Sequence, residues 1–267
     1  MKRSLGRQEA ALLAYAQLRG TSTLRAGDLI QPLKISPTQE TKLFSRMSRS
    51  ALIARVRPGL YLVPPRLPLG GAWSPDEMVV LDTFMKDLDA KFQICGPNAF
   101  NKYGFDEQVP NRIYVYNNRM FGERSIGSVI LSLIKVTDDR LGSIEEVKTT
   151  SGAQIPYSSR TRALMDAVYD WDRFSSLPRA YDWIRKELKS GRVTPAGLAE
   201  TTIQYGNQGT IRRIGLILET TDGPPNVLRK LEKSLKNSDS IIPLVPGFSR
   251  KGTINKRWGI ILTDTHS

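Results

Sequence analysis

The sequence predicts an α+β protein, in which a winged helix-turn-helix over residues 1–70 precedes a larger mixed α/β domain over residues 71–267. Three observations predict this class. The N-terminal stretch has the order helix, helix, turn, helix and hairpin, and a Pro- and Gly-rich segment at residues 64–71 follows it. Beyond that segment, β-branched and aromatic runs are interspersed with amphipathic helical patterns, without internal repeats.

Two helices are predicted before a third helix at residues 37–52. A helix over residues 8–18 would end at Gly20, and its buried side would consist of Leu12, Leu13, Tyr15 and Ala16. Thr23 would cap a second, short helix over residues 24–30, because a hydroxyl there can accept a hydrogen bond from the first helical turn. A turn broken by a proline then leads to the third helix.

The third helix, predicted over residues 37–52, has two chemically different sides. Ser36 suits the N-cap, Pro37 suits the first helical position, and Gln39 completes a capping box. The apolar side would consist of Leu43, Phe44, Met47 and Ala51. The opposite side is basic and rich in hydroxyl groups: Thr38, Lys42, Ser45, Arg46 and Arg49. No Asp or Glu occurs between Thr41 and Pro75, so this side can approach phosphates without repulsion from acids.

Residues 53–63 alternate partly and contain a Pro-Gly turn, which predicts a two-stranded wing. Arg55 and Arg57 would lie on its strand or tip, within reach of a groove or of phosphates. The predicted DNA-binding residues are therefore Thr38, Gln39, Lys42, Ser45, Arg46, Arg49, Arg55 and Arg57. Among them, Arg46 and Arg49 are the expected base readers, because arginine pairs with guanine through two hydrogen bonds.

The distribution of charge supports a polyanionic partner for the N-terminal part. The chain carries a formal net charge of +13. Residues 1–70 hold 12 Lys and Arg against 3 Asp and Glu, a net of +9, whereas residues 71–267 hold 27 against 23, a net of +4. Such concentration of positive charge in one module is typical of a nucleic-acid-binding domain, although solubility alone can also favour basic residues.

The larger domain is expected to contain both helices and strands. The predicted helices lie at residues 73–90 with Ser74 as cap, 96–104, 158–173, 178–190, from Thr194 onward, 209–219 and 226–236. The predicted strands lie at residues 92–95, 113–116, 128–136, 241–245 and 257–263. These patterns leave the topology of the domain open.

Signals for catalysis are weak, so we predict no catalytic residue, no metal and no cofactor. The single histidine, His266, is next to last, and Cys95 is the single cysteine and is expected to be buried. Asp166 and Asp170 share one face of a predicted helix at i and i+4, where they could bind a metal; a salt-bridged helix face is the commoner arrangement. A metal-dependent nucleotidyltransferase-like or nuclease-like enzyme, and an RNA-binding adaptor, therefore stay open as alternatives.

Further basic residues have two interpretations. Arg160 and Arg162, like the turn at residues 96–100, could touch a phosphate or could serve a packed helix start. The basic pairs Arg212/Arg213, Arg250/Lys251 and Lys256/Arg257 could extend a DNA footprint or could be scattered surface charge. No stretch approaches the ~20 apolar residues of a membrane-spanning helix, and no signal-peptide core is visible, so we expect a cytoplasmic protein without a membrane partner.

Five segments, taken in order, resemble the AbiEi family. They are PGLYLV (residues 58–63), FQICGPNAFNKYGF (92–105), VPNRIYVYN (109–117), YSSRTRALMDAV (157–168) and WGIIL (258–262). AbiEi proteins are antitoxins and regulators of type IV toxin–antitoxin and abortive-infection loci, which act in phage defence in bacteria. The resemblance implies a repressor that binds double-stranded DNA at inverted repeats in its own promoter. It also implies neutralisation of a nucleotidyltransferase-like toxin, which in this family can occur without a stable complex.

Overall fold

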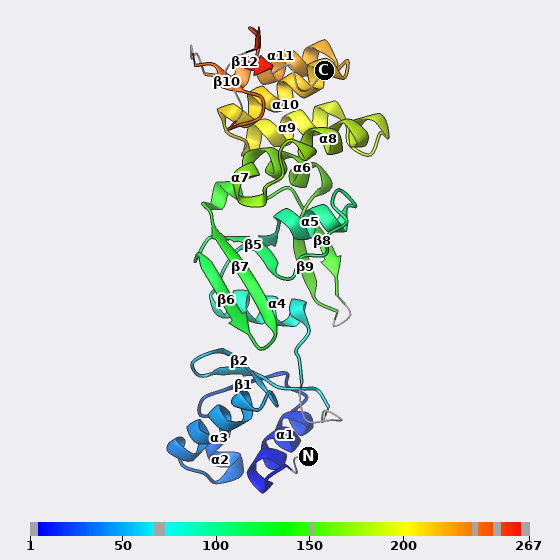
Figure 1. The fold of residues 1–267 in the computed structure, drawn as a ribbon. Coiled ribbons are helices and arrows are strands. Elements are labelled where there is room, and N and C mark those ends of the chain that lie inside the picture. Colours follow the sequence, from blue (N-terminus) through cyan, green and yellow to red (C-terminus); the bar gives the residue numbers. More distant parts are fainter. Residues whose placement is uncertain (1–4, 67–72, 150–151, 237–239, 248–251, 263–267) are drawn as a thin grey trace.

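The computed structural model describes residues 5–66, 73–149, 152–236, 240–247 and 252–262, and the molecule is elongated (Figure 1). The N-terminal helices with a small sheet lie at one end, a six-stranded sheet lies in the middle, and a stack of helices with a second small sheet lies at the other end. The mixed α+β class is therefore confirmed. Within the described residues, none of the helices is both long and apolar enough to cross a lipid bilayer.

The N-terminal part has the order helix, strand, helix, helix, strand, strand. Its elements are α1 (Arg7–Arg19), β1 (Thr23–Arg25), α2 (Ile30–Leu33), α3 (Pro37–Arg49), β2 (Ala54–Arg57) and β3 (Leu60–Leu62). The three strands form an antiparallel sheet of order β1-β3-β2. One side of this sheet and the three helices enclose a core in which the rings of Phe44 and Tyr61 stack with centroids 4.2 Å apart.

The predicted helix over residues 24–30 is wrong. The chain there forms β1, in which Leu24 lies opposite Tyr61, and α2 begins only at Ile30. The side chain of Glu40 on α3 accepts hydrogen bonds from the backbone N–H groups of Gly27 and Leu29, at 2.8 and 2.9 Å. These contacts hold the connecting loop in a non-helical conformation, and a carboxylate 11 to 13 residues away gives no local signal.

The capping box of α3 is confirmed, but the helix is shorter than predicted. The Ser36 hydroxyl accepts from the Gln39 N–H at 3.2 Å, and the Gln39 side-chain oxygen accepts from the Ser36 N–H at 2.8 Å. The helix ends at Arg49 instead of residue 52, because Ala51 adopts a left-handed φ of 52°. Ala51 is consequently exposed, whereas Leu43, Phe44 and Met47 are buried as predicted.

The central part is a six-stranded mixed sheet covered on both faces. Its elements are α4 (Glu77–Asp87), β4 (Phe92–Ile94), α5 (Gly96–Lys102), β5 (Ile113–Asn117), β6 (Gly122–Ile126), β7 (Val129–Lys135), a 3-10 turn (Asp138–Arg140), β8 (Ile144–Lys148) and β9 (Gln154–Ser158). The strand order is β6-β7-β5-β4-β9-β8, in which β5 and β7 pair in parallel, as do β4 and β9. Helix α4 covers one face, and α5 lies on the opposite face (Figure 1).

The prediction from the sequence did not include three strands of this sheet, and it began α4 too early. Strands β6 and β8 lie at the two edges and are mostly exposed, so they lack the alternation of a half-buried strand. No strand was predicted for β9, which ends where the helix predicted over residues 158–173 would begin. Helix α4 begins at Glu77 because the Asp76 carboxylate, instead of Ser74, accepts from the N–H groups of Met78 and Val79.

The C-terminal part is largely helical. Its elements are α6 (Arg160–Tyr169), α7 (Trp171–Phe174), α8 (Arg179–Lys189), α9 (Pro195–Tyr205), α10 (Gln208–Thr220), α11 (Pro225–Ser234), β10 (Ile242–Pro243), β11 (Thr253–Asn255) and β12 (Ile260–Leu262). The predicted helices are confirmed, including the Thr194 cap of α9, except that residues 158–173 are divided between α6 and α7. Trp258 is buried against α10, where it lies over Gly215.

The small N-terminal sheet also packs against the central part. Its second face contributes Ala54, Val56, Leu60 and Leu62 to the apolar cluster that contains Leu81 and Phe84 of α4. The predicted boundary between the two domains, after residue 70, lies outside the described residues. A fragment that ended at residue 70 would expose this apolar face of the sheet, so tests of function should use the full chain.

Gly96 is expected to be intolerant of a side chain. It has a φ of 54°, and a Cβ atom there would lie 2.5 Å from the Phe174 ring. We expect Gly96→Ala to lower the free energy of unfolding by about 2–4 kcal/mol, from left-handed strain plus overpacking. Gly104 has a φ of 72°, and no atom lies within 4 Å of a Cβ placed there. Gly104→Ala should therefore lower the free energy of unfolding by only about 1–2 kcal/mol, from left-handed strain alone. Urea unfolding of both variants measures the difference, and equal losses would contradict the clash with Phe174.

Candidate nucleic-acid interface

Four of the predicted residues form one exposed stripe along α3. Thr38, Lys42, Ser45 and Arg49 occur at i, i+4, i+7 and i+11 of the helix, and all four are exposed. The stripe is exposed because Leu43, Phe44 and Met47, on the opposite side, are held in the N-terminal core. We call these four residues the α3 stripe.

No described acidic residue pairs with Lys42, Arg49 or Arg55. The Arg49 Nε donates to the Ser45 backbone oxygen at 3.3 Å, one turn earlier in the helix. The cationic groups of the stripe are therefore accessible to a ligand, which is the arrangement that phosphate or base contacts require.

Arg46 and Gln39 lie at the flank of the stripe and have partners within the protein. The Arg46 Nε donates to Glu9 Oε1 of α1 at 2.8 Å, and the Glu9 side chain is only 5% exposed. Because the Arg46 side chain itself remains 44% exposed, its guanidinium is positioned by Glu9 without being enclosed. The Gln39 side-chain oxygen likewise has a structural role, because it accepts the Ser36 N–H in the capping box.

Arg55 and Arg57 do not act as one pair, because a β-bulge separates them. Arg55 lies opposite Tyr61, whereas Arg57 lies opposite Leu60, so one residue between them is unpaired. Tyr61 faces the N-terminal core and Leu60 faces α4. Arg57 consequently reaches Asp87 at the end of α4, with Nη2 2.9 Å from Oδ1 and with a second contact from Nε. The prediction placed both residues on the wing within reach of a groove or of phosphates, and it did not include this ion pair.

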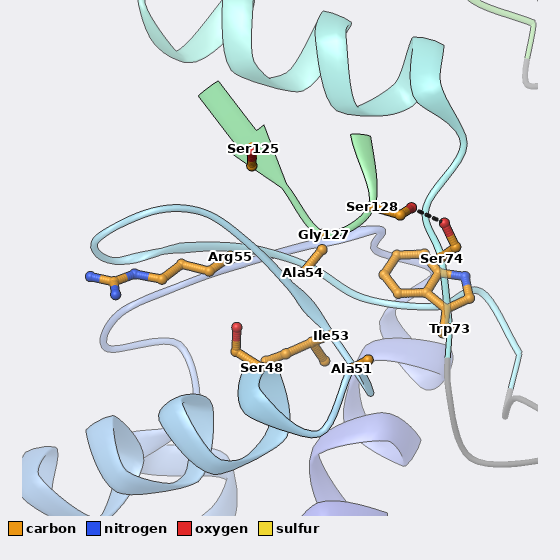
Figure 2. A pocket seen from close by; sticks show the side chains of 10 residues that line it. All are labelled: Ser48, Ala51, Ile53, Ala54, Arg55, Trp73, Ser74, Ser125, Gly127 and Ser128. Atoms are coloured by element: carbon orange, nitrogen blue, oxygen red, sulfur yellow. Dashed lines mark hydrogen bonds between the residues drawn. The ribbon is translucent and has the colours of Figure 1, made fainter. Parts of the chain in front are cut away.

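An open crevice lies where the N-terminal sheet meets the central sheet, with Ser48 of α3 at its edge (Figure 2). Its volume is about 640 Å³, and hydroxyl groups of Ser48, Ser74, Ser125 and Ser128 line it together with Arg55. The Ser74 and Ser128 hydroxyls are hydrogen bonded to each other, and Figure 2 shows Arg55 extending away from Trp73. The crevice therefore places hydroxyl groups near Arg55.

The other basic residues of the larger domain are mostly internal. Arg162 is fully buried, and its guanidinium donates to Asp166 and to the backbone oxygens of Arg140 and Gly142. Arg212 and Arg213 are buried as well, and they donate to the backbone oxygens of Ser240, Pro243 and Leu244. The interpretation of these arginines as phosphate contacts is wrong, because buried guanidinium groups here satisfy carbonyl and carboxylate oxygens.

Among the remaining basic candidates, Arg160 donates to Glu187 at 2.8 Å, and Arg257 donates to Glu219 at 2.8 Å. Lys256 is exposed. Arg250 and Lys251 lie outside the described residues, as does His266.

The two aspartates considered for a metal are engaged with other side chains. Asp166 Oδ1 accepts from Arg162 Nε at 2.9 Å and from Arg140 Nη2 at 3.1 Å. The Asp170 carboxylate accepts from the Tyr116 hydroxyl, and burial raises the pKa of Asp170. Within the described part of the chain, no three His, Cys, Asp or Glu residues are grouped so that they could hold a metal ion. Cys95 is buried as expected, and burial raises the pKa of its thiol.

Sequence reasoning missed three residues of the interface: Glu9, Arg25 and Asp87. Arg25 of β1 donates to Asp87 Oδ1 at 3.2 Å, beside Arg57. Glu9 is 37 residues from Arg46, and Asp87 is 30 residues from Arg57, so no helical or strand spacing connects the partners.

Comparison with known proteins supports the fold and leaves the family open. No protein-family model and no curated protein matches the chain. The fold is similar to that of a solved structure, the RV2827C protein from Mycobacterium tuberculosis, with a TM-score of 0.62 and 13% sequence identity. The similarity covers 97% of this chain and 92% of that protein. The α+β architecture is thus shared over nearly the whole length of both chains.

Proposed function

We propose that the protein binds double-stranded DNA through an N-terminal winged helix-turn-helix and represses transcription of its own operon. The α3 stripe is the observation that carries the proposal, since it combines two exposed cations with two hydroxyl groups on one helix side without an acidic residue. The order of α1, β1, α2, α3, β2 and β3 supports it, because β2 and β3 follow α3 as a wing would. The concentration of positive charge in residues 1–70 supports it independently.

In this proposal α3 enters the major groove. Arg49 reads a guanine through two hydrogen bonds, and Lys42 contacts a phosphate as a point charge. Thr38 and Ser45 donate hydroxyl hydrogen bonds to phosphates or base edges, while Arg55 reaches the DNA from β2. One such domain covers a single half-site, so an inverted repeat in the promoter takes two copies of the chain.

The second half of the proposal rests on the resemblance to the AbiEi family. By that resemblance the larger domain neutralises a nucleotidyltransferase-like toxin encoded beside it, functionally and without a stable complex, in the cytoplasm. Co-expression with the product of an adjacent toxin-like reading frame tests this half. Restored growth is the expected result, and unrelieved growth arrest by an active toxin would contradict it.

Footprinting of the full-length protein on its own upstream region tests the DNA-binding half. We expect protection of two inverted half-sites, centred about one helical turn of DNA or a multiple apart. Competition with random duplex DNA should leave the protection in place, and competition with the same sequence as duplex RNA should not remove it. If scrambled DNA or duplex RNA removes the protection as well as the operator itself does, specific recognition of an operator is contradicted.

A further inference from the structure

Two arginines from different strands converge on one carboxylate at the end of the N-terminal sheet. Arg57 of β2 contacts Asp87 through Nε and through Nη2, and Arg25 of β1 contacts the same carboxylate through Nη2 at 3.2 Å. The Asp87 side chain is only 5% exposed, whereas the side chains of Arg25 and Arg57 are 59% and 44% exposed. The carboxylate thus fills the space between two guanidinium groups whose outer sides face solvent.

The backbone places these two arginines side by side. In the antiparallel sheet, Arg25 and Arg57 are both opposite Leu60, on the two sides of β3. Residues directly opposite each other share one face of a sheet, and this face is the one that packs on α4. The β-bulge in β2 is what brings Arg57 into this position, since regular alternation from Arg55 would direct it to the other face.

We propose that Arg25 and Arg57 form a binding site for a DNA phosphodiester, which Asp87 occupies in the free protein. The proposal rests on the proposed DNA-binding function. A phosphodiester, like a carboxylate, carries one negative charge on two oxygens, and guanidinium groups bind both anions through paired N–H donors. Hydrogen bonding to Arg57 lowers the pKa of Asp87, which agrees with a carboxylate that stays ionised in this position.

The site belongs to the same N-terminal unit as the α3 stripe. Arg25 and Arg57 flank the β2–β3 turn, and the loop that follows Arg25 is hydrogen bonded to Glu40 of α3. The site and the α3 stripe are therefore parts of one N-terminal unit. When DNA binds, a phosphate approaches from the exposed side of the two guanidinium groups and displaces Asp87. The displaced carboxylate stays nearby and repels the phosphate. Asp87 thereby lowers affinity for any duplex, independently of sequence.

Asp87→Asn tests the proposal, with Asp82→Asn as the matched control. Both residues lie on α4, and both substitutions remove one negative charge, but Asp82 pairs with Lys86 on the same helix. On a random-sequence duplex we expect Asp87→Asn to bind about three- to tenfold tighter than wild type, because the substitution removes the one negative charge that opposes the bound phosphate. We also expect the slope of log K against log salt to steepen by about 0.9, whereas Asp82→Asn should change neither quantity to that extent.

The arginines must account for the gain. Adding Arg25→Ala and Arg57→Ala to Asp87→Asn should abolish the tighter binding, and Arg57→Gln alone should flatten the salt slope. A lowered melting temperature would show that Asp87→Asn destabilises the fold. In that event the proposal is tested by the slope of log K against log salt for Arg57→Gln. Equal behaviour of Asp87→Asn and Asp82→Asn, or an unchanged slope for Arg57→Gln, overturns the proposal. If this site is overturned but wild type binds duplex DNA and Arg49→Ala weakens that binding, the proposed function stands without the site. If wild type binds no duplex DNA, the proposed function and the site both fail.

Discussion

Replacing Arg49 with alanine is expected to weaken binding to the operator by about 1–3 kcal/mol, roughly 5- to 150-fold, and to relax preference at one base pair. Arg49 is exposed at the C-terminal end of the α3 stripe, and no described acidic residue holds its guanidinium. A bidentate contact to guanine carries sequence information, so its loss should be larger on the operator than on random DNA.

Fluorescence anisotropy on the operator, on single-base variants and on random duplex measures this effect. Arg229→Ala is the matched control, because Arg229 is an exposed arginine of α11 at the far end of the molecule and its loss changes net charge equally. Lys42→Ala offers the contrasting result: about equal weakening on all duplexes, and a salt slope flatter by about 0.9. Equal losses for Arg49→Ala on operator and random DNA would refute a base-reading role for Arg49.

Replacing Asp166 with alanine is expected to lower the free energy of unfolding by about 3–5 kcal/mol, a large part of the 5–15 kcal/mol typical of a folded protein. The side chains of Asp166 and Arg162 are both 0% exposed, and Arg140 contacts the same carboxylate oxygen. Removal of the carboxylate leaves a buried guanidinium without its counter-ion, which is the most destabilising way to break such a pair.

Urea unfolding of Asp166→Ala beside Asp182→Ala measures this effect. Asp182 is paired with Arg185 on α8, but its side chain is 79% exposed, so its loss should change stability by no more than about 1 kcal/mol. The Asp166→Ala effect should be the same with magnesium and with a chelator, because Asp166 serves two arginines. A magnesium-dependent loss of stability would instead favour the metal-site interpretation, and a loss equal to that of Asp182→Ala would contradict the structural role.

Local chemistry made several elements predictable. The capping box of Ser36 and Gln39, the Thr194 cap and the buried side of α3 all depend on residues within a few positions of each other. The same local logic failed at residues 24–30, where Glu40 from α3 holds the loop and β3 recruits the chain into a strand. The edge strands β6 and β8 were missed because exposed strands have no burial period to detect.

The sequence by itself determined which side of α3 is basic, because helical spacing and the absence of nearby acids are properties of neighbouring residues. Only the tertiary structure decided which of those cations are free. Arg46 meets Glu9, and Arg57 meets Asp87, across 37 and 30 residues of chain, while Arg162 and Asp166 turned out to be buried together. Ion pairs of this kind form where packed elements bring charges within reach, and packing depends on the whole apolar pattern of the chain.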